Sequence, residues 1–476
     1  MSDPKQRNTD LANGVRFRTL MRDRAAYDAK TGTWYVWDSR RWCRVSPRSM
    51  AYVRQLAREV VLSIDSEVAR ATDDDQRKRL REWATQSQSN ARMSAMIAAA
   101  ETEQDLWVND SDYDADPNLL NCMNGTVDLR TGECRPHDPN DKITRLVPVE
   151  YRPNAVAPKF VAALRRAFAK DESGDAARYF LKALGYSLRG NNPEQVAFFA
   201  VGDTNTGKSL TLEVVAEVLG SDYADSTVKR SVLSKNKYGN GASDTDLNKL
   251  LGRRFAAITE ASLALDLDED SFKSHTGSSV FSLRHLYGER FTVPLTWTFF
   301  VAANAMPNIE RWEPALGRRM VVFDSGPTVP EHERDLSLRE SILRDESEGV
   351  LAALVAGSVH YEADRKRLGH VFNVKNAPAA VRDAIAEVER DSDHAMAFIR
   401  DRLEFGESHR VSKASAFRAF KDSRGRAVVG HTAQSFNKAV LRYAEAEGLT
   451  YVAADTRNLL GVRLRELTLA ELAEAN

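Results

Sequence analysis

Cysteine is scarce in this sequence, and the few cysteines form no recognisable pattern. Only three are present, Cys43, Cys122 and Cys134, and neither a C-x-x-C pair nor a Cys/His ligand spacing occurs. An odd number of cysteines without such spacing favours neither a disulfide framework nor a structural zinc site. We therefore expect these three side chains to be ordinary thiols.

Long apolar runs are also missing. No stretch approaches the roughly 18 apolar residues that a membrane-spanning helix requires. The first residues, MSDPKQRNTD, are polar and do not resemble an apolar secretory signal. These features predict a protein that has no membrane partner and stays in the cytoplasm.

A net charge of either sign is nearly absent. The 67 Lys and Arg residues face 68 Asp and Glu residues, which leaves a formal charge of −1 at pH 7. Such a chain has no overall positive field that would draw it onto nucleic acid. Any contact with DNA must therefore come from a local patch or from a channel assembled between subunits.

What is present is an ordinary globular composition in a long chain. Of the 476 residues, 42% are hydrophobic and 28% are charged, which excludes a disordered or fibrous chain. The length suffices for about three domains. Residues 31–45 alternate aromatic and polar side chains around a polar turn, which predicts a β-hairpin. Its aromatic residues either stack on bases or, as we expect, pack a small domain: Trp34, Tyr35, Trp37 and Trp42.

The rest of the chain changes periodicity several times. Apolar residues recur at helical spacing over residues 49–107, 156–185 and 331–390. A short β unit with a Thr-Gly turn is expected at 124–137, and strands alternate with helices between Val196 and Phe323. The pattern predicts an α/β core that is preceded and followed by helices.

The strongest single signal is a phosphate-binding loop. The pattern G-x-x-x-x-G-K-S occurs at residues 202–209, between an apolar run that predicts a strand and an amphipathic stretch that predicts a helix. Its glycines let backbone N–H groups turn toward phosphates, and the helix N-terminus adds partial positive charge. We expect ATP with Mg²⁺ as the ligand, and the nucleotide contacts are predicted to be Gly202, Asp203, Thr204, Asn205, Thr206, Gly207, Lys208, Ser209 and Leu210.

Polar residues at later positions could complete this site. An apolar strand runs from Phe255 and ends in Thr259 and Glu260, and a carboxylate there could activate water or hold a metal. Another buried strand ends in Asn304, whose amide could orient water opposite the γ-phosphate. Because kinases, GTPases and motors share the phosphate-binding loop, these residues alone leave the class of enzyme open.

Taken in order, several segments resemble superfamily 3 helicases, and most closely the helicase part of phage, plasmid and poxvirus-type primase-helicases. They are GDTNTGKS, the strand ending in Glu260, KSHTG, the strand ending in Asn304 with Pro307 after it, and GRRMVVF. The segment NGTVDLRTGE looks like the region upstream of the motor in that family, and the tail looks like its winged-helix domain. The resemblance spans most of the chain.

The resemblance implies an AAA+-like core, with a parallel sheet flanked by helices, that assembles as a hexameric ring with ATP between subunits. Lys208 and Ser209 are then the Walker A pair, with Ser209 on the metal. Glu260 is the Walker B acid and second metal ligand, and Asn304 is the sensor. Either Arg318 or Arg319 would be an arginine finger that acts on the neighbouring subunit's ATP. The alternative for both arginines is a basic pair that faces solvent or phosphate.

The expected domains are an N-terminal mixed helical and β-hairpin domain at 1–150, a helical collar at 151–195 and the ATPase core at 196–330. A helical subdomain at 331–390 and a winged-helix domain at 391–476 follow. Two features depart from the family. Thr259 stands where many members carry a second acid, so Glu260 alone would serve as metal ligand and base. No primase motif is recognisable, so primer synthesis is not expected and a separate primase or initiator is a further expected partner.

Single-stranded DNA is the expected partner in the ring channel. A hairpin around residues 287–290 would enter the channel, and its candidate cations are Lys273, Arg284, His285 and Arg290. The alternative is that these charges are simply exposed at a turn. In the tail, a winged helix could face duplex DNA through Lys438, Arg442, Arg457 and Arg463, although such domains also dock proteins.

The function that the sequence favours is an ATP-dependent DNA helicase that translocates on single-stranded DNA during replication of a phage or mobile element. The main alternative is an ATP-dependent origin-binding initiator or loader that does not unwind DNA processively. A nucleotide or small-molecule kinase is less favoured, because the chain has long flanking domains and no recognisable acceptor-binding motif.

Overall fold

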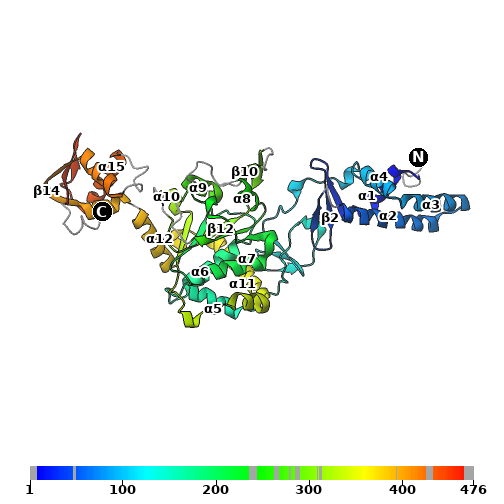
Figure 1. Ribbon diagram of the computed structural model, residues 1–476, viewed down its shortest axis with the longest axis horizontal. Coiled ribbons are helices and arrows are strands. Elements are labelled where there is room, and N and C mark those ends of the chain that lie inside the picture. The colour runs from blue at the N-terminus through cyan, green and yellow to red at the C-terminus, as the bar shows by residue number, and fades with distance from the viewer. Residues whose placement is uncertain are drawn as a thin grey trace.

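The computed structural model describes residues 8–46, 50–234, 244–261, 267–277, 280–284, 290–307, 309, 313–392, 394–424 and 433–465. Its elements form an elongated arrangement with an N-terminal part, a central α/β part and a C-terminal part (Figure 1). The central part carries the phosphate-binding loop, so the other two parts are described mainly by how they join it.

The N-terminal part is a small helical unit beside a three-stranded antiparallel sheet. Strands β2 and β3 form the hairpin predicted at 31–45, and Trp34, Tyr35 and Trp42 are buried. Trp37 is partly buried and packs against Tyr35 and Trp42, so the four aromatic residues pack the N-terminal part as predicted. The elements are α1 (Asp10–Met21), β1 (Ala25–Asp28), β2 (Thr33–Trp37), β3 (Trp42–Val45), α2 (Ala51–Arg70), α3 (Asp74–Ser87) and α4 (Asn90–Ala100).

A second antiparallel sheet connects this unit to the central part. It consists of β4 (Leu119–Cys122), β5 (Gly125–Asp128) and β6 (Cys134–Arg135). The pair β5–β6 confirms the β unit predicted at 124–137. Strand β4 was not predicted, because its four residues are all buried and show no alternation.

The N-terminal hairpin also contacts the helix that follows the phosphate-binding loop, α7 (Lys208–Tyr223). Arg41 in the hairpin turn forms an ion pair with Asp222, near the carboxyl end of α7. Arg145 and Arg253 both donate to the Asp222 carbonyl oxygen, at 2.7 and 3.2 Å. Cations at this end offset the negative pole of the helix and the Asp222 carboxylate.

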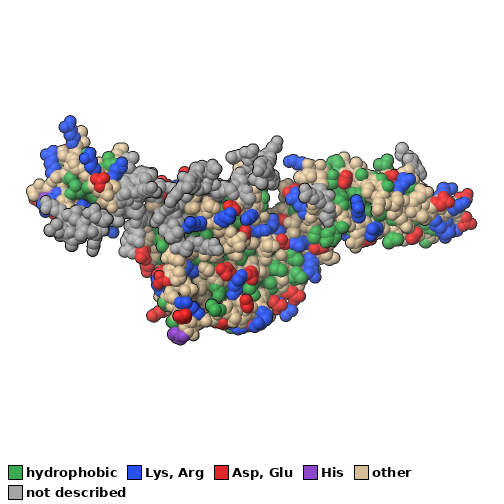
Figure 2. All heavy atoms as spheres, viewed as in Figure 1, with side chains coloured by type: hydrophobic (Ala, Val, Ile, Leu, Met, Phe, Trp, Pro, Cys, Tyr) green, Lys and Arg blue, Asp and Glu red, His purple; other side chains and the backbone are tan. Residues whose placement is uncertain are grey.

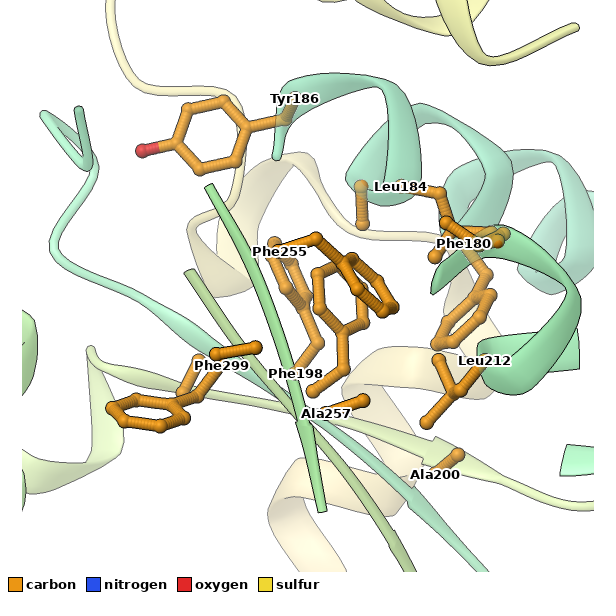
Figure 3. Packing of buried hydrophobic residues seen from close by; sticks show 14 of the residues in the cluster. Phe180, Leu184, Tyr186, Phe198, Ala200, Leu212, Phe255, Ala257 and Phe299 are labelled. Atoms are coloured by element: carbon orange, nitrogen blue, oxygen red, sulfur yellow. The ribbon is translucent and has the colours of Figure 1, made fainter. Parts of the chain in front are cut away.

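The central sheet has five parallel strands in the spatial order β13-β7-β12-β9-β8. They are β7 (Ala197–Val201), β8 (Ala224–Asp225), β9 (Phe255–Ala261), β12 (Thr298–Ala303) and β13 (Met320–Asp324). Helices cover the sheet, so β7 and β12 read as continuous apolar runs. Phe198 and Phe255 lie beside Phe180 and Leu184, whereas Phe299 points away from them (Figure 3). This confirms the predicted α/β core.

One hydrophobic core joins the central sheet to helices that come before and after its strands in the sequence. Its buried members run from Leu120 to Val388, and they cross the boundaries expected at 150, 195 and 330. Gly185 and Gly357 let two of these helices approach closely, because a Cβ at Gly185 would lie 2.4 Å from the Ser358 nitrogen. The helices are α5 (Pro158–Ala167), α6 (Asp175–Tyr186), α7, α11 (Leu338–Leu368) and α12 (Ala379–Ser392).

A β-hairpin stands at the edge of the central part. Strands β10 (Val280–Arg284) and β11 (Arg290–Pro294) pair antiparallel, with Arg284 opposite Arg290. This confirms the two short strands predicted around Tyr287, while residues 285–289 lie outside the described ranges. The remaining short helices of the central part are α8 (Asp244–Asn248), which packs against β10, α9 (Glu269–Gly277) and α10 (Pro314–Gly317), which packs against β13.

The C-terminal part has a separate core around Phe398, Phe420 and Phe436. Its three-stranded antiparallel sheet has the order β14-β16-β15, and the β15–β16 pair confirms the hairpin predicted in the tail. The ten-residue β14 was not predicted. The elements are α13 (His394–Arg402), β14 (Leu403–Ser412), α14 (Lys413–Arg424), α15 (Ala433–Ala446), β15 (Ala453–Ala454) and β16 (Asn458–Leu464).

Candidate nucleotide-binding site

The loop between β7 and α7 forms a tight turn at the carboxyl edge of the parallel sheet. Gly202, Asn205 and Gly207 have φ values of 144°, 58° and 97°, a region that glycine enters freely and asparagine tolerates. A Cβ at Gly202 would lie 2.8 Å from the Ser325 Cβ. The glycine is therefore needed both for its backbone angle and for close approach. Ligands of open α/β sheets bind at this edge.

Neighbouring segments hold the loop in place. The Gly202 nitrogen donates to the Ala303 carbonyl oxygen of β12 at 3.1 Å, and the Val329 nitrogen donates to the Asn205 carbonyl oxygen at 2.9 Å. The Thr328 hydroxyl donates to the Thr204 carbonyl oxygen at 3.0 Å. The loop is thus supported by β12 and by the segment after β13, so its shape is fixed from two sides.

Lys208, the first residue of α7, lies inside this turn. Its side chain is 6% exposed, and its ammonium nitrogen Nζ donates to the carbonyl oxygens of Gly202 and Asp203 at 2.9 and 2.5 Å. Burial lowers the pKa of Lys208, and the nearby Asp203 carboxylate opposes that shift. The buried Lys208 ammonium group, surrounded by the backbone of the loop, could form charge-assisted hydrogen bonds with an anionic ligand such as a phosphate chain.

The chemistry of the loop fits the phosphates of a nucleotide. The Thr206 hydroxyl is buried, and among the described residues it has no hydrogen-bond partner. Buried polar groups rarely remain unsatisfied, so a phosphate oxygen could accept this hydrogen bond. Gly207 lies against α5, since a Cβ there would come within 3.8 Å of the Ala167 Cβ.

Two further predicted residues follow the same sheet edge. Val201 of β7 pairs with Ala303 of β12, which pairs with Ala261 of β9. Asn304, directly after β12, is exposed beside the loop. The backbone of Glu260 lies in β9, and its side chain falls outside the described residues. The fold therefore brings the loop, Glu260 and Asn304 to one edge, while their catalytic roles remain predictions.

A pocket of about 740 Å³ opens over the loop. Besides loop residues 205–210, the residues that line it were missed by sequence reasoning. They are Lys159, Ala162, Ala163 and Arg166 from α5, and Val329, Glu333, Arg334, Asp335, Leu336 and Leu338 from the segment after β13. These segments lie far apart in the sequence and carry no motif. Arg166 and Glu333 form an ion pair across the pocket, at 2.9 Å.

Arg318 and Arg319 lie at the opposite edge of the sheet. They precede β13, which runs parallel to β7, with Met320 paired to Ala197. Along β13 this places them roughly 20 Å from the carboxyl edge, given the usual rise of a strand. Neither arginine can reach the phosphate-binding loop of the same chain.

The two arginines differ in their surroundings. Arg318 is exposed, whereas Arg319 is 9% exposed. Arg319 donates to the Ala315 carbonyl oxygen at 2.7 Å and to the Gln195 side chain at 3.2 Å. Burial lowers the pKa of Arg319, and the neighbouring Arg318 adds to that shift. Of the two, only Arg318 is available to a neighbouring molecule.

The candidate DNA-contacting residues differ in whether their side chains are exposed or already paired with an acidic residue. Lys273 forms an ion pair with Glu313 at 2.8 Å. Arg284 and Arg290 face each other in the hairpin register, but their side chains and His285 lie outside the described residues. In the tail, Lys438 and Arg457 are exposed, and Arg463 donates to Glu404 at 2.7 Å. The side chain of Arg442 also lies outside the described residues. On the face that Figure 2 shows, basic and acidic side chains are interspersed.

The described residues offer no membrane-spanning helix and no cluster of metal ligands. No helix there has the length and apolarity that crossing a membrane would take. Within the same ranges, no group of three or more His, Cys, Asp or Glu side chains is placed to hold a metal ion.

Comparison with known proteins gives a consistent but distant relationship. Residues 14–169 match the family described as D5 N terminal like, a region that includes the NGTVDLRTGE segment. The chain is 23% identical over 383 residues to the Frog virus 3 (isolate Goorha) protein named "Putative helicase 022R", covering 65% of this chain and 39% of that protein. It is also 23% identical to "Putative helicase L207/L206" of Acanthamoeba polyphaga mimivirus, covering 62% of this chain and 32% of that protein.

The chain thus spans about a third to two fifths of the length of these viral relatives. Among solved structures, the apo form of the NrS-1 C terminal region is similar, with a TM-score of 0.47 and 12% sequence identity. That alignment covers 94% of this chain and 98% of the other.

Proposed function

We propose that this protein is an ATP-hydrolysing DNA helicase that works as a ring during replication of a phage or mobile element. The observation that carries the proposal is the separation of two groups. The buried Lys208 cradle lies at one edge of the sheet, and the exposed Arg318 lies at the other. An ATPase site completed by a neighbouring subunit's arginine would use both groups.

In the proposed site the loop, Asn304 and Ser209 each have one role, and Glu260 has two. The loop backbone and Lys208 bind the phosphates, and Asn304 orients the attacking water. Glu260 acts as the base, which its place beside β12 in the sheet allows. Ser209 and Glu260 would hold the Mg²⁺ that accompanies ATP, and this ion supplies charge neutralisation on the phosphates when bound.

The remainder of the nucleotide would occupy the pocket over the loop. Its wall includes the apolar side chains of Ala162, Leu210 and Leu336, which suit the faces of a nucleobase. Leu336 is 95% exposed, so covering it with a base would remove apolar surface from water. Charged groups at the rim, such as Arg166 with Glu333, are already paired.

The proposed assembly is an AAA+-like hexameric ring in which Arg318 lies against the neighbour's nucleotide. Each subunit then presents two different surfaces, its loop edge and its arginine edge, and such head-to-tail contacts form a ring when the rotation between subunits closes. This arrangement makes hydrolysis depend on assembly. A monomer would bind ATP yet turn it over slowly, because no guanidinium of its own chain reaches the phosphates.

DNA would contact the hairpin and the C-terminal part. Strands β10 and β11 carry Arg284 and Arg290 near the hairpin turn, where cations could track the phosphates of a single strand. The C-terminal part has the order helix, strand, helix, helix, strand, strand, which supports a winged helix for duplex DNA. The names of two viral relatives begin with "Putative helicase", and this supports the helicase proposal.

The test combines hydrolysis, unwinding and particle shape. The rate of ATP hydrolysis is measured with and without single-stranded DNA. Strand displacement is measured on a forked duplex, and the particle shape is imaged by electron microscopy with a nonhydrolysable ATP analogue. We expect stimulated hydrolysis, displacement and rings. Stimulated hydrolysis without displacement would assign an origin-binding initiator or loader instead. Full hydrolysis by a protein that stays monomeric would contradict the proposal.

A further inference from the structure

Two short helices on the arginine side of the sheet are tied together by side chains. Helix α9 leads into the β10–β11 hairpin, and helix α10 leads into Arg318. Lys273 of α9 pairs with Glu313, the residue directly before α10, at 2.8 Å. We call this contact, together with the Arg319 contacts described next, the α9–α10 clasp.

The second link of the clasp runs through Arg319. Its guanidinium donates to the Ala315 carbonyl oxygen in α10 and to the Gln195 amide oxygen. The Gln195 amide nitrogen in turn donates to the carbonyl oxygen of Gly277, the last residue of α9, at 3.3 Å. Helices α9 and α10 are therefore joined at two places, by the Lys273–Glu313 ion pair and by the hydrogen bonds that run through Arg319 and Gln195.

The fit around Gly277 is close. A Cβ at Gly277 would lie 2.8 Å from the Arg319 terminal nitrogen Nη2 and 3.3 Å from its Nε. The guanidinium thus packs directly on the backbone at the end of α9. Arg319 is 9% exposed. If this end of α9 moved while Arg319 stayed in place, guanidinium N–H groups would lose their hydrogen-bond partners or become exposed, at a cost in free energy.

Helix α9 is held to the sheet at its middle. Phe272 is fully buried, and its ring centroid lies 6.0 Å from that of Phe199 in β7. Movement of the hairpin base would therefore be taken up at the end of α9, three residues before Val280. On the other side of the clasp, Arg318 adjoins Arg319 in the chain. The α9–α10 clasp is therefore adjacent in the chain to the hairpin on one side and to the exposed Arg318 on the other.

We propose that the α9–α10 clasp couples DNA engagement at the hairpin to the position of Arg318 at the neighbouring subunit's nucleotide. This inference rests on the proposed function. Lys273 is then a positioning residue that acts through Glu313, and not a DNA contact. Arg319 is likewise a positioning residue, because its guanidinium is used inside its own subunit. A chain of packed and hydrogen-bonded side chains that joins two sites is the kind of physical link that carries coupling between them.

The test compares the ATPase rate of the full chain with and without single-stranded DNA. In Glu313→Gln the partner charge of Lys273 is removed, and we expect the basal rate to be kept while DNA stimulation falls roughly 2- to 30-fold. Asp74→Asn removes one acid of an exposed ion pair on α3 and should leave stimulation unchanged. Thermal unfolding of both variants should match the wild type, since both pairs are partly solvated.

A charge exchange separates positioning from DNA binding. Lys273→Glu alone should lose stimulation, and Lys273→Glu combined with Glu313→Lys should regain it. A Lys273 that touched DNA would not be rescued in this way. Full stimulation of Glu313→Gln, or no rescue by the exchange, would overturn the clasp proposal alone. A wild-type protein without any stimulation would overturn the proposed function, and the clasp with it.

Discussion

The Lys208 ammonium nitrogen donates a hydrogen bond to the carbonyl oxygen of Gly202, 2.9 Å away, across the turn of the phosphate-binding loop. The two residues stand at the ends of the loop, so the side chain that would bind phosphate also closes the cradle. Substitution at either end should therefore change both nucleotide binding and the shape of the turn.

For Lys208→Ala we expect ATP turnover to fall at least roughly 100-fold, the usual cost of removing one well-placed donor from a charged reaction centre. Steady-state phosphate release measures this. Lys366→Ala, at an exposed position of α11, is the matched control and should behave as wild type. A Lys208→Ala protein with normal turnover would remove the basis for the proposed ATPase site.

Gly202→Ala tests the close approach to Ser325. The new Cβ meets the Ser325 Cβ at 2.8 Å and the backbone has φ 144°, so we expect a loss of about 1–3 kcal/mol in the free energy of unfolding and weaker ATP binding. Gly369→Ala is the control, because φ is also positive there but no atom lies within 4 Å. Chemical denaturation and a nucleotide-binding titration would show whether only Gly202→Ala affects binding.

The two arginines before β13 should behave differently. Arg318→Ala should bind ATP normally and hydrolyse it roughly 1000-fold more slowly, the scale known for arginine fingers. Mixing it with Lys208→Ala subunits should restore part of the activity, because one mutant supplies an intact loop and the other an intact Arg318. Arg22→Ala, at an exposed site on α1's end, is the control. Mixtures that remain inactive would contradict a shared site.

Leu336→Ser tests the nucleobase wall. Because Leu336 is 95% exposed, the change should leave thermal stability unaltered, yet raise the KM for ATP roughly 3- to 10-fold through lost apolar contact. Leu62→Ser, at a 63% exposed position on α2, controls for loss of a surface leucine. An unchanged KM would place the base elsewhere.

His275 makes stability depend on pH. It is buried against Phe281, and burial lowers the pKa of His275 to about 4, below the usual value of about 6.5. The unfolded chain therefore binds the proton first as pH falls, so stability is complete above about pH 6.5 and declines toward pH 4.

Between pH 7.5 and 5, the wild type should lose about 2 kcal/mol more free energy of unfolding than His275→Gln. Urea denaturation at both pH values measures this difference. Equal losses for both proteins would show that other groups control the acid sensitivity.

The local parts of this structure were predictable, and the tertiary parts were not. The loop, the predicted hairpins, the strand before Asn304 and the strand after Arg319 have contiguous sequence signals, because turns and strand periodicity are set by neighbouring residues. The pocket wall around Ala162 and Leu336 joins segments that are about 170 residues apart. No local pattern distinguishes the buried Arg319 from the exposed Arg318, since burial depends on Gln195 and Gly277.

Lys273 illustrates the same limit for charged side chains. Its sequence context next to a hairpin that was expected to bind DNA suggested a phosphate contact, whereas the structure pairs it with Glu313, forty positions later. A basic residue is a candidate for DNA binding only when its acidic neighbours are known.

The continuous core from Leu120 to Val388 decides how this protein can be shortened. A fragment cut at residues 196 and 330 would keep every predicted catalytic residue but would remove α5, α6 and α11 from the sheet. The rings of Phe323 and Phe198 in the sheet would then lose their neighbours Phe180 and Tyr186. Recombinant trimming should instead retain the whole interval and remove only the flanking parts, whose apolar interiors are their own.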